Sequence, residues 1–190
     1  ATRAARQRPE DLQAWALFVQ AENMHASQFT PDTARAAEKL VRRATEIEPA
    51  YGPGWAQLAS TISQRAIYGL SADVAKDRDE AQSLVGKALR LAPNDPLVLG
   101  YCGLVYVSTG QTAQGIDCLE RSLALNPNNG LVRLNYGFAL WCNGAPGAGL
   151  AQIEDFFRLS PKDPNAGIGH VWSSFCYLAL ENYPGAEESA

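Results

Sequence analysis

Two histidines and four cysteines are the side chains of this 190-residue sequence best suited to bind a metal or act as nucleophiles. His25 and His170 stand far apart, and neither has another ligand at the short spacing typical of zinc sites. The cysteines are Cys102, Cys118, Cys142 and Cys176. They form no Cys-x-x-Cys pair, and each falls within a predicted helix. This placement favours four small buried apolar side chains over a metal site, and it favours a core or rim position for His170.

The acidic residues do not form a catalytic pattern either. Asp79 and Glu80, like Glu187 and Glu188, fall at or near predicted helix starts, where carboxylates interact favourably with the helix dipole. The sequence contains no glycine-rich phosphate loop, no Gly-x-Ser-x-Gly turn and no His-Glu-x-x-His helix. We therefore expect this chain not to be an enzyme, and to use no cofactor and no metal.

The formal net charge of −4 and the hydrophobic content of 46% are typical of an ordinary globular chain. Nucleic-acid-binding proteins usually present a basic patch, which this charge balance does not predict. No apolar run approaches the roughly 20 residues that cross a membrane. We therefore expect neither nucleic acid nor membrane as a partner of this segment. Unpaired thiols favour a reducing compartment, so we expect a cytoplasmic location, with a membrane anchor elsewhere in a longer parent protein left open.

Prolines mark a repeat of 34 residues. Pro93, Pro127 and Pro161 are each separated by this distance, and each closes a predicted pair of helices. In the third unit, Gly110 is placed to end the first helix in a left-handed conformation. Four residues at spacings of three, one and three form the packed face of that helix, namely Leu99, Cys102, Gly103 and Tyr106. The predicted fold is all-α, a right-handed α-solenoid of antiparallel helix pairs with about four and a half units.

The predicted solenoid covers residues 9–190 and follows a linker over residues 1–8. Its units span residues 9–49, 50–93, 94–127, 128–161 and 162–190, the last of them truncated. The first two units exceed the period, by about six and about ten residues. Residues 67–73 belong to this excess, which either forms loops at the solenoid edge or lengthens the helices. Because the chain starts without methionine and stops within a repeat, we expect a fragment of a longer protein.

One position of the fourth unit departs from the repeat pattern. The second helices carry a small residue near their end where units pack closely, and Ser122 fills this place in the third unit. Phe156 fills it in the fourth. We therefore expect looser or rearranged packing around Phe156.

The period, the closing prolines and the helix faces resemble the tetratricopeptide repeat over roughly residues 9–190. A narrower resemblance, carried by residues 29–34, the long second unit and residues 159–164, is to repeat regions attached to bacterial class III adenylate and guanylate cyclases and to winged-helix transcriptional regulators. In those proteins the repeats form a sensory or interaction region. The resemblance implies a protein-binding module of a larger signalling protein such as a nucleotide cyclase. No cyclase catalytic segment is present, so no catalytic residue is transferred.

The resemblance also implies that the first helix of each unit lines an inner groove. In the second unit the inward positions are small or polar, namely Pro53, Ala56, Ser60 and Gln64. In the later units they are apolar, namely Leu97, Leu104, Val107, Leu131, Leu134, Phe138, Trp141, Val171, Phe175 and Leu178, with Ile168 beside them. A monomer seldom leaves such a patch uncovered. These apolar residues are therefore the predicted protein-binding residues.

Chaperone-binding members of the family hold a terminal carboxylate with Lys, Arg and Asn in the groove. Of the matching positions here, only Asn135 carries a residue of that set. We therefore do not expect a carboxylate clamp.

Several interpretations of the apolar groove remain open. It binds an amphipathic helix or extended segment of a protein or peptide partner. It pairs with a second copy of the chain in a homodimer. Alternatively, other parts of the parent chain fill it, and the region is a rigid spacer beside an enzymatic or DNA-binding domain. If the inward assignment is shifted by one position, these side chains belong to the core instead.

Overall fold

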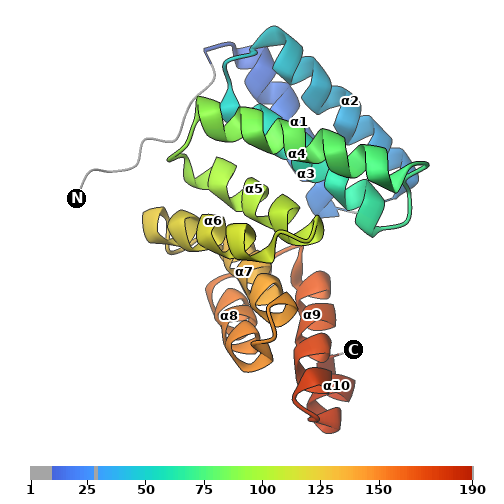
Figure 1. The fold of residues 1–190 in the computed structure, drawn as a ribbon, viewed down its shortest axis with the longest axis vertical. Coiled ribbons are helices and arrows are strands. Elements are labelled where there is room, and N and C mark those ends of the chain that lie inside the picture. The colour runs from blue at the N-terminus through green and yellow to red at the C-terminus, as the bar shows by residue number, and fades with distance from the viewer. Residues whose placement is uncertain (1–9, 28–29, 190) are drawn as a thin grey trace.

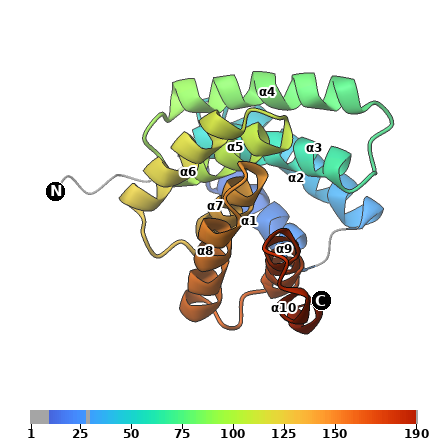
Figure 2. The same ribbon diagram turned by 60° about the horizontal axis from the view of Figure 1, so that its bottom comes forward.

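The computed structural model describes residues 10–27 and 30–189, so the linker expected over residues 1–8 lies outside the described residues. This part of the chain folds into ten helices and contains no strand. The helices are α1 (Leu12–Ser27), α2 (Pro31–Ile47), α3 (Gly52–Ile67), α4 (Val74–Leu91), α5 (Pro96–Ser108), α6 (Thr112–Leu125), α7 (Gly130–Cys142), α8 (Pro146–Leu159), α9 (Ala166–Ala179) and α10 (Tyr183–Ser189). Consecutive helices pack as pairs, and the pairs stack from α1 and α2 at one end to α9 and α10 at the other (Figure 1; Figure 2).

The third and fourth units repeat with the predicted period. α5 and α7 each have 13 residues and begin at Pro96 and Gly130, 34 positions apart, whereas α6 and α8 each have 14 residues. The side chain of Asp95 accepts hydrogen bonds from amides in the first turn of α5, and Asn129 caps α7 in the same way. Gly110 has φ +85° and ends α5 in the left-handed region, as predicted.

The extra residues of the second unit mainly lengthen its helices. α3 has 16 residues where α5 has 13, and α4 has 18 where α6 has 14. The connection at residues 68–73 is six residues long, against three at residues 109–111. The alternative of lengthened helices is therefore correct for most of the insertion, and a short loop at the edge accounts for the rest.

Ion pairs tie the lengthened helices together. The Arg65 guanidinium donates two hydrogen bonds to the Asp77 carboxylate, at 2.9 and 2.5 Å, and a third to Glu38 at 2.6 Å. Arg42 on α2 pairs with both Glu38 and Glu80. Because Arg65 hydrogen-bonds the buried Asp77 carboxylate, the pKa of that carboxyl lies below its usual value. The network joins α2, α3 and α4 through charged side chains.

Glycines allow the two helices of a pair to approach closely. A Cβ on Gly103 would lie 2.6 Å from Cγ of Leu119, and one on Gly115 would lie 2.8 Å from the Gly103 carbonyl oxygen. The same contact recurs in the next unit, where a Cβ on Gly149 would lie 2.6 Å from the Gly137 carbonyl oxygen. Real side chains do not pack at such distances, so both helix crossings require glycine.

Phe156 is fully buried, so the expectation of looser packing around it is wrong. Glycines on the neighbouring first helices make room for its ring. A Cβ on Gly130 would lie 3.3 Å from the Phe156 ring, and one on Gly169 would lie 3.1 Å from it. The adjacent ring of Phe157 packs against it with centroids 5.2 Å apart. The packing is thus rearranged around a larger side chain without opening a cavity.

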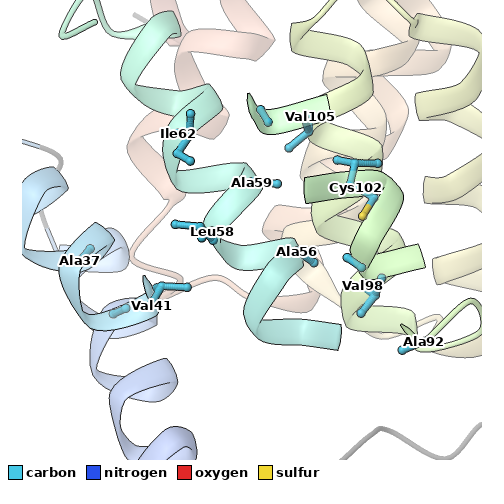
Figure 3. Packing of buried hydrophobic residues seen from close by; sticks show 14 residues of the cluster. Ala37, Val41, Ala56, Leu58, Ala59, Ile62, Ala92, Val98, Cys102 and Val105 are labelled. Atoms are coloured by element: carbon cyan, nitrogen blue, oxygen red, sulfur yellow. The ribbon is translucent and has the colours of Figure 1, made fainter. Parts of the chain in front are cut away.

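The largest buried cluster lies among α1 to α5 and centres on α3. Figure 3 shows Ala56 and Ala59 on α3 facing Val98 and Val105 on α5, while Leu58 lies on the side of α2. Small residues on the α5 side bring these two helices close together.

All four cysteines are free thiols, and three of them are buried as predicted. The buried thiols are those of Cys102, Cys118 and Cys176. Burial raises the pKa of Cys176 to about 11, which keeps the thiol protonated and inert at neutral pH. Cys142 is exposed because it is the last residue of α7, so the prediction of burial is wrong for this thiol.

Candidate protein-binding groove

Aromatic side chains of α7 and α9, the first helices of the last two units, form a continuous stack. The Phe138 ring stacks on Trp172 with centroids 4.5 Å apart and on Trp141 at 5.8 Å. Trp141 in turn stacks on Phe175 at 5.3 Å. The planes within these pairs differ by 21° to 28°, so the rings are stacked rather than edge-to-face. We call Phe138, Trp141, Trp172 and Phe175 the aromatic ladder.

Large apolar side chains remain open to solvent on the helices of the ladder. The sequence-predicted residues with the greatest exposed fractions are Leu131 at 37%, Phe175 at 38%, Val171 at 42% and Leu178 at 50%. Phe138 and Trp141 are half-buried, as are Leu97 and Leu104 on α5 and Ile168 on α9. Half-buried rings with exposed aliphatic neighbours leave apolar surface available to another chain.

Two of the predicted binding residues lie in the core instead. Leu134 has no exposed surface and belongs to a buried cluster with Ile153 of α8 and Cys176 of α9. Val107 is only 6% exposed because its side chain fills the space above Gly115, where a Cβ would lie 2.5 Å from a Val107 methyl. The assignment of these two residues to the groove is therefore wrong, and both stabilise the helix packing.

Trp172 was not predicted, although its ring makes the shortest contact in the aromatic ladder. The 34-residue alignment selects its neighbour Val171 for the inward position. α9 begins 36 residues after α7, at Ala166 rather than at the position that the period specifies. This offset changes which side chains of α9 meet α7. The run of apolar residues around Trp172 was the only signal in the sequence that pointed to it.

The groove expected along α3 is closed. Pro53, Ala56 and Ser60 are buried, and the Tyr101 hydroxyl on α5 donates a hydrogen bond to Glu22 on α1 at 2.7 Å. Because the inner side chains of α3 are small, α1 and α5 meet across it. The expectation of a small and polar groove in the second unit is therefore wrong, and the exposed apolar surface is confined to the later units.

The first helices of the last three units carry almost no charge. Among α5, α7 and α9 the charged or titratable side chains are Arg133 and His170, apart from tyrosines and cysteines. Arg133 donates hydrogen bonds to Gln152 at 2.9 Å and to the Pro127 carbonyl oxygen at 2.9 Å, so its guanidinium points towards α8 and the loop before α7. His170 is exposed, with its ring 4.6 Å from that of Phe157. Neither side chain brings a charge to the aromatic ladder.

The remaining candidates for chemistry form no site in the described ranges. No group of three or more His, Cys, Asp or Glu side chains there could hold a metal ion. The side chain of His25 lies outside the described residues, and His170 has the expected rim position. Glu80 pairs with Arg42 at 2.6 Å, which gives it a structural role. Among the helices described, none is long and apolar enough to cross a membrane.

No protein-family model matches this chain. The transcriptional regulator HilA of Salmonella typhimurium is 23% identical over 159 residues, which covers 82% of this chain and 28% of that protein. The chain thus spans little more than a quarter of the length of the curated relatives it matches.

Solved structures with low sequence identity share the fold. TTC0263, a thermophilic tetratricopeptide-repeat protein of Thermus thermophilus, has a TM-score of 0.67 and 20% identity, over 88% of this chain and 82% of its own. YrrB, a tetratricopeptide-repeat protein with an unusual peptide-binding site, has a TM-score of 0.51 and 19% identity, over 93% and 82%. This chain therefore has the all-α solenoid fold of tetratricopeptide-repeat proteins.

Proposed function

We propose that this chain is a non-catalytic protein-interaction module, and that the aromatic ladder holds an amphipathic helix or an extended apolar segment of a partner protein. The observation that carries the proposal is a stack of four rings on α7 and α9, flanked by exposed aliphatic side chains and free of charge. Buried aromatic residues supply much of the binding energy at protein interfaces.

The chemistry of the surface restricts the partner. With no cation near the ladder, a terminal carboxylate or a phosphorylated side chain would gain no ion pair there. Apolar side chains of a partner would gain roughly 25 cal/mol for each Å² removed from water. A helix with apolar residues at positions i, i+3, i+4 and i+7 offers such a face.

We infer a place for this module within a larger regulatory protein. The relative HilA is a transcriptional regulator, which favours a DNA-binding domain as the effector, and a nucleotide cyclase is the alternative. YrrB, which shares the fold, has a peptide-binding site, and this supports peptide binding as a function of the present chain. Free cysteines favour a reducing compartment such as the cytoplasm.

A display library of random 16-residue peptides tests the proposal. We expect selection on the wild-type chain to enrich peptides with apolar residues at helical spacing. Their binding should be lost in Phe175→Asp, because the substitution places a charge on the apolar surface. Tyr183→Asp is the matched control, since Tyr183 is an exposed aromatic residue at the start of α10. Equal binding to both variants, or enriched peptides without apolar residues, would contradict the proposal.

Self-association is the second candidate function, favoured by the exposed Val171 and Leu178 beside the ladder. Light scattering after size exclusion, over a range of concentrations, measures it. A dimer that dissociates in Phe175→Asp but not in Tyr183→Asp would identify a second copy as the occupant of the groove. A monomer at all concentrations would exclude this candidate.

A further inference from the structure

The solenoid contains a step between its second and third units. The helices of the α3–α4 pair have 16 and 18 residues, and those of the α5–α6 pair have 13 and 14. The α3–α4 loop therefore extends past the turn between α5 and α6, and Figure 1 shows it at the outer edge of the array. The overhang leaves part of α3 and α4 without a neighbouring helix.

A hollow of about 120 Å³ lies at this step. It is lined by the end of α3, the start of α4 and the end of α5, namely Ser63, Ala66, Ile67, Val74, Arg78, Ser108 and Thr109. Large apolar side chains stand open around it, with Ile67 exposed to 52% and Val74 to 49%. Tyr68, in the adjoining loop, is exposed to 47%. The hollow has room for one aliphatic side chain of another molecule.

The step is held in place from both sides. Beneath the loop, Arg65 and Asp77 join α3 to α4 with two hydrogen bonds. Within the loop, the Leu70 amide donates to the Arg65 carbonyl oxygen at 2.9 Å, and the Asp73 carboxylate caps α4 by accepting from the Lys76 amide at 3.0 Å. A surface that is already ordered loses little conformational entropy when a partner binds.

Arg78 is the charged member of the lining. Its side chain is exposed, and within the described ranges it forms no ion pair or hydrogen bond. The hydroxyls of Ser108 and Thr109 each donate to the Val105 carbonyl oxygen at 2.9 Å, so they are directed into α5. The guanidinium is therefore the group of the hollow that is available to a polar partner, and it selects a carboxylate.

We propose that this step is a second docking surface, separate from the aromatic ladder, for an acidic-apolar segment of a partner protein. An aliphatic side chain of the segment enters the hollow between Ile67 and Val74. A neighbouring Asp or Glu side chain of the segment pairs with Arg78. A side-chain carboxylate fits better than a chain terminus, because the lining offers one guanidinium and no further free donors.

Selection of random 12-residue peptides on the wild-type chain tests this proposal, with affinities measured by fluorescence anisotropy. We expect one enriched class to carry Asp or Glu next to Leu, Ile, Val or Phe. Arg78→Glu should weaken that class on the order of tenfold, because an attraction becomes a repulsion. Lys76→Glu is the matched control, since it reverses the same charge two residues away on the same helix, outside the hollow. We expect less than about a threefold effect from it.

Two further variants separate this surface from the groove. Val74→Ala removes apolar lining and should weaken the same peptides, whereas Phe175→Asp should leave their affinity unchanged. The proposal is overturned if no acidic-apolar class is enriched, if Arg78→Glu and Lys76→Glu have equal effects, or if Phe175→Asp abolishes binding. All of these variants change exposed residues, and circular dichroism verifies that each one folds.

Discussion

The ring of Trp172 on α9 stacks on the ring of Phe138 on α7, with centroids 4.5 Å apart and planes inclined by 21°. This contact joins the first helices of the last two units directly, and it extends the stack that continues through Trp141 to Phe175. The same rings therefore hold α9 in place and present apolar surface.

Replacing Trp172 with alanine tests the structural part of this role. Trp172→Ala should lower the free energy of unfolding by about 2 kcal/mol, since a half-buried, stacked ring is lost. Trp15→Ala should cost less than about 1 kcal/mol, because the Trp15 side chain is 48% exposed. Urea denaturation followed by circular dichroism measures both changes. Equal losses for the two variants would mean that the stack contributes nothing to stability.

Two leucines of α7 distinguish surface from core. Leu134→Ala should destabilise the fold by about 3 kcal/mol, because Leu134 is fully buried and the substitution leaves a cavity. Leu131→Ala should cost less than about 1 kcal/mol, since Leu131 is 37% exposed. Thermal or urea unfolding of the two variants provides the comparison. A reversed order would return Leu134 to the surface and contradict the packing described above.

The close crossing of α7 and α8 gives a second matched pair. Gly137→Ala should destabilise the chain by about 2 kcal/mol or more, because its Cβ would lie 2.7 Å from Ile153 and 2.8 Å from the Gly149 carbonyl oxygen. Gly147→Ala should be neutral or stabilising by about 0.5 kcal/mol, since nothing lies within 4 Å of its Cβ. Melting temperatures measured side by side test the prediction. Two equally stable variants would show that the crossing does not need glycine.

The Arg65–Asp77 pair predicts a dependence of stability on pH. Arg65 lowers the pKa of Asp77 in the folded state, so the pair stabilises the fold above the unfolded-state value of about 3.9. This contribution is lost as the pH falls through the folded-state pKa. At pH 7, Asp77→Asn should reduce the unfolding free energy by about 2 kcal/mol, and the gap to the wild type should narrow below about pH 4. Urea titrations at a series of pH values measure this gap. A gap that stays constant down to pH 2 would exclude the pair as its source.

The sequence predicts what depends on local periodicity. The 34-residue period predicted the bounds of α5 to α8 closely, because helix caps such as Asp95 and turn glycines such as Gly110 act within a few residues. It also identified three of the four ladder residues. It missed Trp172, since α9 is offset from the period by two residues. Such an offset arises from packing around Phe156 and its neighbours, which no single-sequence pattern encodes.

The closure of the groove along α3 depends on contacts between distant residues. Tyr101 and Glu22 are 79 positions apart, and their hydrogen bond forms only after α1, α3 and α5 have stacked. The small side chains of α3, such as Ala56 and Ser60, were correctly identified in the sequence, but they were assigned to an open polar surface. Small residues in the middle of a stack also let the helices on either side approach each other, and this effect dominates here.

Indole proton resonances test the central claim most directly, namely that the aromatic ladder is the surface on which a partner binds. The chain has four tryptophans, two of them in the ladder and two elsewhere. On addition of a peptide from the apolar class selected on the wild-type chain, the Nε1–H signals of Trp141 and Trp172 should shift. The signals of Trp15 and Trp55 should stay in place, the latter because its Nε1–H donates to the Pro49 carbonyl oxygen away from the ladder. Shifts confined to Trp15 or Trp55 would contradict the account.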